Sequence, residues 1–136
     1  MNRDELRSML VLHEGLRLHP YRCTAGKLTI GVGRNLDDRG ITQAEAMMML
    51  ENDISEVEKD LDREYPWWRD MSPARQCVLA DMCFNLGLFR LSGFVNALKA
   101  MLDGHYDDAA DHMLDSLWAR QVGQRAQRLA KMMRDG

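Results

Sequence analysis

The stretch HEGLRLHPYRCTAGKLTIGVG, residues 13–33, decides the fold of the N-terminal part of the chain. It begins where a helical pattern ends. The apolar positions upstream of it recur at helical spacing: Leu6, Met9, Leu10 and His13. Because Gly15 is a common helix stop, we expect a helix over residues 3–13, with Glu14 at its C-terminus.

Between residues 18 and 35 the helical pattern disappears. Four turn-forming residues punctuate this segment: Pro20, Gly26, Gly31 and Gly33. Among them Leu28, Ile30 and Val32 alternate along the chain, as in a half-buried strand. The pattern predicts a short β-hairpin region and, in its simplest interpretation, places Thr29 on the polar face of the strand.

The rest of the chain has helical patterns. Residues 42–45, TQAE, form a capping box with Thr42 as N-cap, which opens a helix running to about Arg63. Tyr-Pro-Trp-Trp at residues 65–68 ends that helix, and its aromatic side chains are expected to pack against the lobes. Further helices are predicted from Ser72-Pro73 to near Gly87, from Ser92 to before Gly104, around Tyr106–Leu117 and from about Gly123 to Met133.

One helix, a small sheet and then helices alone make an α+β arrangement that is mainly helical. At 136 residues the chain is expected to be a single domain, residues 1–136. Its N-terminal lobe would cover about residues 14–60, and its helical C-terminal lobe about residues 61–136 together with the first helix.

Composition and charge exclude several classes of protein. With 46% apolar and 29% charged residues the chain is not disordered or of low complexity, and no apolar run could span a bilayer. The net charge of −3 argues against a nucleic-acid binder, although five basic residues lie within residues 118–136. The N-terminus lacks a signal peptide pattern, so we expect a cytoplasmic monomer without stable membrane association.

Cysteine and histidine spacing gives no support to a metal site. Three cysteines leave one unpaired in any pairing, and none forms a CxxC motif. The four histidines form no HExxH pair. We therefore expect neither a metal nor another cofactor.

The stretch at residues 13–33 resembles the active-site region of phage-type lysozymes, the endolysin muramidases. A helix-terminal Glu-Gly is followed by an aromatic residue and by Gly-x-x-Thr-Ile-Gly-x-Gly. The family triad is Glu, eight residues, Asp or Cys, five residues, Thr, and Glu14, Cys23 and Thr29 match this spacing. Downstream landmarks extend the resemblance over nearly the whole chain: MCFNLGL at residues 82–88, Gly93-Phe94, and Trp118-x-x-Gln121-x-x-x-Arg125.

The resemblance implies a lysozyme-like fold and an N-acetylmuramidase, a glycosidase that cuts the MurNAc–GlcNAc β-1,4 bond of peptidoglycan. Glu14, Cys23 and Thr29 would be catalytic, with Glu14 as proton donor and Thr29 holding the attacking water. Arg125, pairing with Glu14, and Gln121 would support them, and the remaining expected contacts with the glycan are Asn85 and Gly31. An endolysin of this kind would wait in the host cytoplasm until the membrane is permeabilised and then act on the cell wall.

The residues by themselves leave alternatives open at Glu14 and Arg125. Glu14 alone would be interpreted as a solvated residue at a helix end, and Arg125 as a surface residue of a basic helix. The helix C-terminus favours the protonated acid of Glu14, whereas an arginine partner favours the carboxylate. The sequence does not decide between these two effects.

Cys23 departs from the aspartate that most members of the family carry. A thiol has an ordinary pKa of roughly 8.5, so it is mostly neutral near pH 7 unless its surroundings lower that value. Cys23 could work in place of aspartate, could be a spectator, or could mark lost activity. We favour the first interpretation, since Glu14, Thr29 and Arg125 are all present.

Two other classes of protein compete with the hydrolase. The first is an inactive or transglycosylase lysozyme-fold protein that binds cell-wall glycan, for which Cys23 is the support. The second is an unrelated helical protein that binds an acidic partner through its basic C-terminal helix. The second leaves the spacing from Glu14 to Gly33 unexplained.

Overall fold

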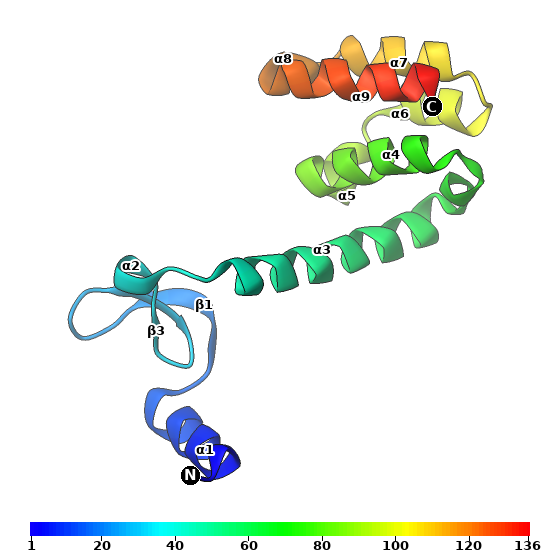
Figure 1. Ribbon diagram of the computed structural model, residues 1–136. Coiled ribbons are helices and arrows are strands. Elements are labelled where there is room, and N and C mark those ends of the chain that lie inside the picture. Colours follow the sequence, from blue (N-terminus) through cyan, green and yellow to red (C-terminus); the bar gives the residue numbers. More distant parts are fainter. The chain divides into compact units, whose positions relative to one another are not determined.

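In the computed structural model, residues 1–136 divide into an N-terminal unit, Met1–Met48, and a helical unit, Met49–Gly136 (Figure 1). The N-terminal unit begins with helix α1 (Arg3–Glu14), whose first turn is capped by the Asn2 side chain. Gly15 ends this helix at φ 79°, and its amide donates to the carbonyl of Val11. The predicted helix and its glycine stop are both confirmed.

A three-stranded antiparallel sheet follows α1, in the order β1 (Arg17–Arg22), β2 (Leu28–Gly31) and β3 (Arg34–Asn35). Tyr21 lies opposite Thr29 in the β1–β2 pair, with an irregularity in the register between Arg17 and Tyr21. The predicted hairpin is confirmed, and the short β3 extends it.

The alternation expected along β2 is wrong in one respect. Thr29 is the buried residue of the strand, at 3% exposure, whereas Leu28 and Ile30 are only half-buried and Val32 is exposed. Thr29 tolerates burial because its hydroxyl donates to the carbonyl of Lys27, so no polar group is left unpaired.

Two helices complete the N-terminal unit and lead out of it, α2 (Leu36–Arg39) and α3 (Gln43–Glu64). The predicted capping box is present at the start of α3. The amide of Glu45 donates to the Thr42 hydroxyl, and the amide of Thr42 donates to the Glu45 carboxylate. Helix α3 is 22 residues long, and its last sixteen residues belong to the helical unit.

The helical unit continues from α3 through seven further elements, and its core is rich in leucine and methionine. These elements are η1 (Pro66–Asp70), α4 (Pro73–Leu86), α5 (Leu88–Leu91), α6 (Val95–Leu102), α7 (Tyr106–Leu114), α8 (Leu117–Val122) and α9 (Gln124–Asp135). Helix α4 contributes Val78, Leu79 and Met82 to the core, and α7 packs against both α6 and α9 (Figure 1). The Tyr65–Trp68 segment packs on this core, as predicted, with Trp68 buried.

Two helix boundaries differ from those predicted. The helix expected from Ser92 begins only at Val95, after the separate short α5. The helix expected over residues 106–117 ends at Leu114, because the Ser116 side chain accepts from the Ala119 amide and starts α8.

None of the helices combines the length and the apolar character that a membrane-spanning segment needs.

Candidate active site

Cys23 and Thr29 are brought together by one tight turn between β1 and β2. The amide of Cys23 and the hydroxyl of Thr29 both donate to the carbonyl of Lys27, each at 2.9 Å. The amide of Gly26 donates to the carbonyl of Cys23 at 2.8 Å, which closes the turn. The predicted catalytic pair therefore shares a single main-chain acceptor.

The turn also acts on the protonation of the Cys23 thiol. Hydrogen bonds from the backbone amides of Lys27 and Ala25 favour the thiolate and hold the pKa of Cys23 below its ordinary value. Partial burial opposes this lowering of the pKa. At neutral pH more of this half-buried thiol is ionised than in a free cysteine.

Glu14 is the last residue of α1, and its exposed side chain lies against Gly33. A β-carbon at Gly33 would stand 2.7 Å from Glu14 Oε2, closer than atoms normally approach. Gly33 also has φ 66°, a conformation that favours glycine. The sequence pattern contained Gly33, but only the structure shows that it makes room for the carboxylate.

Gly31 ends β2 opposite Arg17 and has a different requirement for glycine. A β-carbon there would meet no atom within 4 Å, but the residue has φ 69°. The Arg17 guanidinium stacks over the ring of Tyr21 at 4.5 Å from its centroid. The main chain at Gly31 is therefore accessible beside a cation–π pair.

Two acidic residues of α2 bind residues of the same turn. Asp37 accepts a hydrogen bond from the amide of Leu28 at 2.7 Å, and Asp38 pairs with the side chain of Lys27 at 3.2 Å. Nothing in the sequence pattern indicates a role for either aspartate.

Arg34 links the sheet to the start of α3. Its guanidinium donates to Glu45 at 2.9 Å and to the carbonyl of Gly40 at 3.3 Å. The Arg34 hydrogen bond, together with those from Thr42, lowers the pKa of Glu45 to about 2. Arg34 therefore forms its ion pair within the N-terminal unit.

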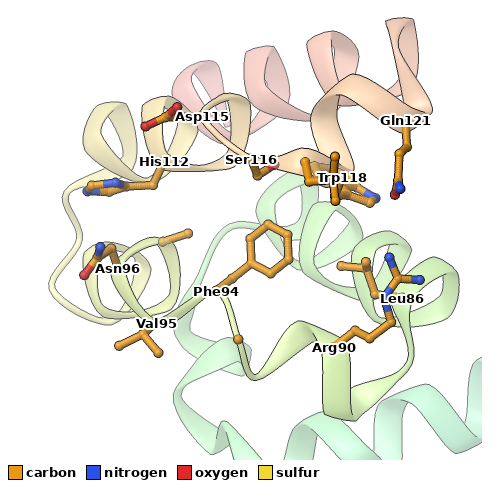
Figure 2. A pocket seen from close by; sticks show the side chains of 13 residues that line it. Leu86, Arg90, Phe94, Val95, Asn96, His112, Asp115, Ser116, Trp118 and Gln121 are labelled. Carbon is orange, nitrogen blue, oxygen red and sulfur yellow. The ribbon is translucent and has the colours of Figure 1, made fainter.

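In the helical unit, Gln121 lines a pocket of about 470 Å³ (Figure 2), whereas Asn85 is not one of its lining residues. The indole of Trp118 donates to the carboxamide oxygen of Asn85 at 2.8 Å, which leaves the Asn85 amide group free to donate. Trp118 also packs edge-on against Phe94, at 5.9 Å between ring centroids. Gln121 and Trp118 reach the pocket from α8, and Arg90 reaches it from α5 (Figure 2).

Arg125 begins the basic face of α9 and pairs with Asp81 of α4. Its Nε donates to Asp81 Oδ1 at 2.9 Å, and its Nη2 is 2.8 Å from the same oxygen. The sequence pattern does not indicate this acceptor. The pairing of Arg125 with Glu14 stays a prediction.

The comparisons with known proteins agree with this architecture. The family model that describes phage lysozymes matches residues 11–134, which include Glu14, the Cys23–Thr29 turn and Arg125. The chain therefore belongs to the phage lysozyme family.

The chain is similar in sequence to three relatives that differ in how much of their length it covers. It is 29% identical to the pre-baseplate central spike protein Gp5 of Enterobacteria phage T4 over 94% of its own length and 27% of that protein. It is 26% identical to the probable T4-type lysozyme 2 of Dictyostelium discoideum over 98% of the chain and 95% of the relative. It is 32% identical to the SAR-endolysin of Escherichia phage Mu over 79% of the chain and 63% of the relative. The chain thus spans about a quarter of the spike protein and nearly all of the Dictyostelium protein.

Proposed function

We propose that the protein is a glycoside hydrolase that cleaves the MurNAc–GlcNAc β-1,4 bond of bacterial peptidoglycan. The observation that carries the proposal is the Cys23–Thr29 pair, whose two members share the Lys27 carbonyl as acceptor. They occupy the positions at which the family spacing expects the residues that hold the attacking water. Membership of the phage lysozyme family supports a lysozyme-type enzyme.

In the proposed mechanism Glu14 donates a proton to the departing sugar oxygen as the glycosidic bond breaks. A water held by Thr29 and Cys23 attacks the anomeric carbon from the opposite face. The proton of this water passes to the Cys23 thiolate, which the Lys27 and Ala25 amides favour by lowering the pKa of Cys23. The new bond to water forms on the face opposite to the leaving group, so the anomeric configuration is inverted.

Four further residues have supporting roles in this proposal. Arg125 and Gln121 support the acid, whereas Asn85 and Gly31 contact the glycan. The free amide group of Asn85, held in place by Trp118, is suited to donate to a sugar or peptide oxygen. Alanine in place of Asn85 should raise KM more than it lowers kcat, in assays of purified peptidoglycan strands.

The anomer formed first from a defined muropeptide oligosaccharide, followed by NMR, tests the role of Cys23. Inversion supports a held water, and retention would instead mean that the thiolate attacks and forms a covalent intermediate. Loss of activity in Glu14→Gln is expected in either case. Full activity of Cys23→Ala would contradict both roles of the thiol.

We further propose that the protein acts in phage-mediated lysis, as a monomer that reaches peptidoglycan after the membrane has been opened. The similarity to a phage spike protein favours a second candidate, a lysozyme-fold module that acts or binds within a virion. Clearing of chloroform-treated Gram-negative cells, lost in Glu14→Gln, would support the lytic enzyme.

Mass spectrometry of digested cell wall separates the remaining alternatives. Reducing muramic ends would support hydrolysis, and anhydro ends would mean a transglycosylase. Glycan left intact by a folded protein would contradict an enzymatic function.

A further inference from the structure

The peptide group between Lys27 and Leu28 is hydrogen-bonded on both of its sides. Its carbonyl accepts from the Cys23 amide and from the Thr29 hydroxyl. Its N–H, which is the amide of Leu28, donates to Asp37 Oδ2 at 2.7 Å. A carboxylate on α2 is therefore joined to the Cys23–Thr29 pair through one peptide plane.

The charge of this acceptor matters for the pair. Hydrogen bonds to a carboxylate are shorter and stronger than those between neutral groups. A peptide whose N–H donates to a carboxylate is polarised, which makes its carbonyl oxygen a better acceptor. Asp37 therefore strengthens the acceptor that the Thr29 hydroxyl and the Cys23 amide share.

The Thr29 hydroxyl has a single proton to donate. While that proton is bonded to the Lys27 carbonyl, the oxygen of Thr29 can only accept hydrogen bonds from its other neighbours. An accepting hydroxyl is what a water molecule needs if it is to be held by one of its protons with its lone pair free for attack. Orientation of Thr29 toward Lys27 thus determines how it can hold water.

We propose that Asp37 is a positioning residue for the Cys23–Thr29 pair, which it orients by holding the Lys27–Leu28 peptide group. The inference rests on the proposed function for its catalytic meaning. Two charged side chains share the neighbourhood of Asp37. Arg22 lies 3.8 Å from Asp37 and donates to the carbonyl of Gly26, and the side chain of Lys27 pairs with Asp38.

The pH dependence of Cys23 alkylation by iodoacetamide tests the inference directly. Peptide mass spectrometry follows Cys23, with the exposed Cys77 of the same molecule as an internal reference. In Asp37→Ala the Lys27–Leu28 peptide group loses the carboxylate that holds it. The turn that directs the Ala25 and Lys27 amides at Cys23 then loosens, so the midpoint of Cys23 alkylation should rise by about one pH unit. Removal of the negative charge alone would lower that midpoint, so the sign separates positioning from simple electrostatics.

Two variants serve as comparisons. Asp37→Asn keeps an oxygen that can accept from the Leu28 amide, so its shift should be smaller than that of the alanine variant. Asp38→Ala removes the same charge from the same helix, but Asp38 Oδ1 and Oδ2 contact only the side chains of Lys27 and Asn35. Its Cys23 midpoint should not rise, and loss of the charge alone should lower it slightly.

Kinetics and NMR add readouts that a merely structural residue would not move. In Asp37→Ala we expect kcat for peptidoglycan cleavage to fall about ten-fold with little change in KM. In the unaltered protein, the Leu28 amide proton signal should move as Asp37 is protonated, and the Cys23 amide signal should move with the same midpoint. The NMR titration needs no variant to fold.

An unchanged or lowered alkylation midpoint in Asp37→Ala would overturn the inference, as would an equal shift in Asp38→Ala. Independent titration of the Leu28 and Cys23 amide signals would overturn it as well. A folded protein that leaves peptidoglycan intact would contradict the proposed function alone, because alkylation and NMR still report on the Asp37 contact.

Discussion

The carboxylate of Glu14 lies against the α-carbon of Gly33, with room for a hydrogen atom there but not for a side chain. A β-carbon at residue 33 would be 2.7 Å from Oε2 and 3.0 Å from Cδ of Glu14. The end of α1 and the turn between β2 and β3 therefore meet at this glycine. The close approach makes Gly33 a steric determinant of where the acid can lie.

Gly33→Ala should lower glycan cleavage at least ten-fold, because the added methyl group displaces the Glu14 carboxylate. Its positive φ adds a stability cost of about 1–2 kcal/mol. Gly104→Ala is the matched control, with φ 76° and nothing within 4 Å of the added carbon. Urea unfolding should show similar losses of stability in both variants, and equal losses of activity would contradict a specific effect on Glu14.

Glu45 should make stability depend on acid. Its pKa falls from an ordinary 4.5 to about 2 in the folded protein, with the Arg34 hydrogen bond as the largest cause. A lowered folded pKa gives a stabilisation that is complete above about pH 4.5 and is lost as the pH falls toward 2. The difference in unfolding midpoint between the unaltered protein and Glu45→Gln should therefore shrink across this range. A difference that is constant with pH would contradict the Arg34 pairing.

Thr29→Val should lower glycan cleavage about a hundred-fold, because the water site is lost. The change keeps the shape of the residue but removes the hydroxyl that donates to Lys27. Thr24→Val, in the exposed part of the same turn, should leave cleavage unchanged.

Ser116→Ala should destabilise the helical unit by about 1 kcal/mol, because the Ser116 side chain caps α8 by accepting from Ala119. The urea midpoint should fall with little change in the slope of the transition. Ser92→Ala is a useful comparison, since the exposed Ser92 follows α5 and caps no helix N-terminus. A fall in the urea midpoint that is larger in Ser92→Ala than in Ser116→Ala would mean that the break between α7 and α8 does not depend on the Ser116 cap.

Features encoded by residues close in sequence could be predicted. Gly15 ends α1, and Thr42 with Glu45 opens α3, because each of these signals acts within four residues. The break at Ser116 was missed since apolar periodicity continues across it, and only the cap geometry shows that a new helix begins. A serine three residues before a helical amide is a common N-cap, so Ser116 itself is the sequence signal for this break.

Hydrogen-bond partners of side chains could not be predicted. Thr29 was expected on a polar face, because alternation does not show that a neighbouring carbonyl pairs with its hydroxyl and permits burial. The Arg125–Asp81 pair joins residues 44 positions apart, and helix periodicity alone does not say which acid a basic helix meets. The family pattern identified the candidate residues, whereas their hydrogen-bond partners required coordinates.

The turn that carries Cys23 is closed by main-chain hydrogen bonds of that residue. Its N–H donates to Lys27 and its carbonyl accepts from Gly26, so the turn does not depend on which side chain residue 23 bears. A carboxylate and a thiol are therefore interchangeable there without remodelling the backbone. A protein with this turn can exchange one chemistry for another by a single codon change, and Cys23→Asp should fold as the unaltered chain does.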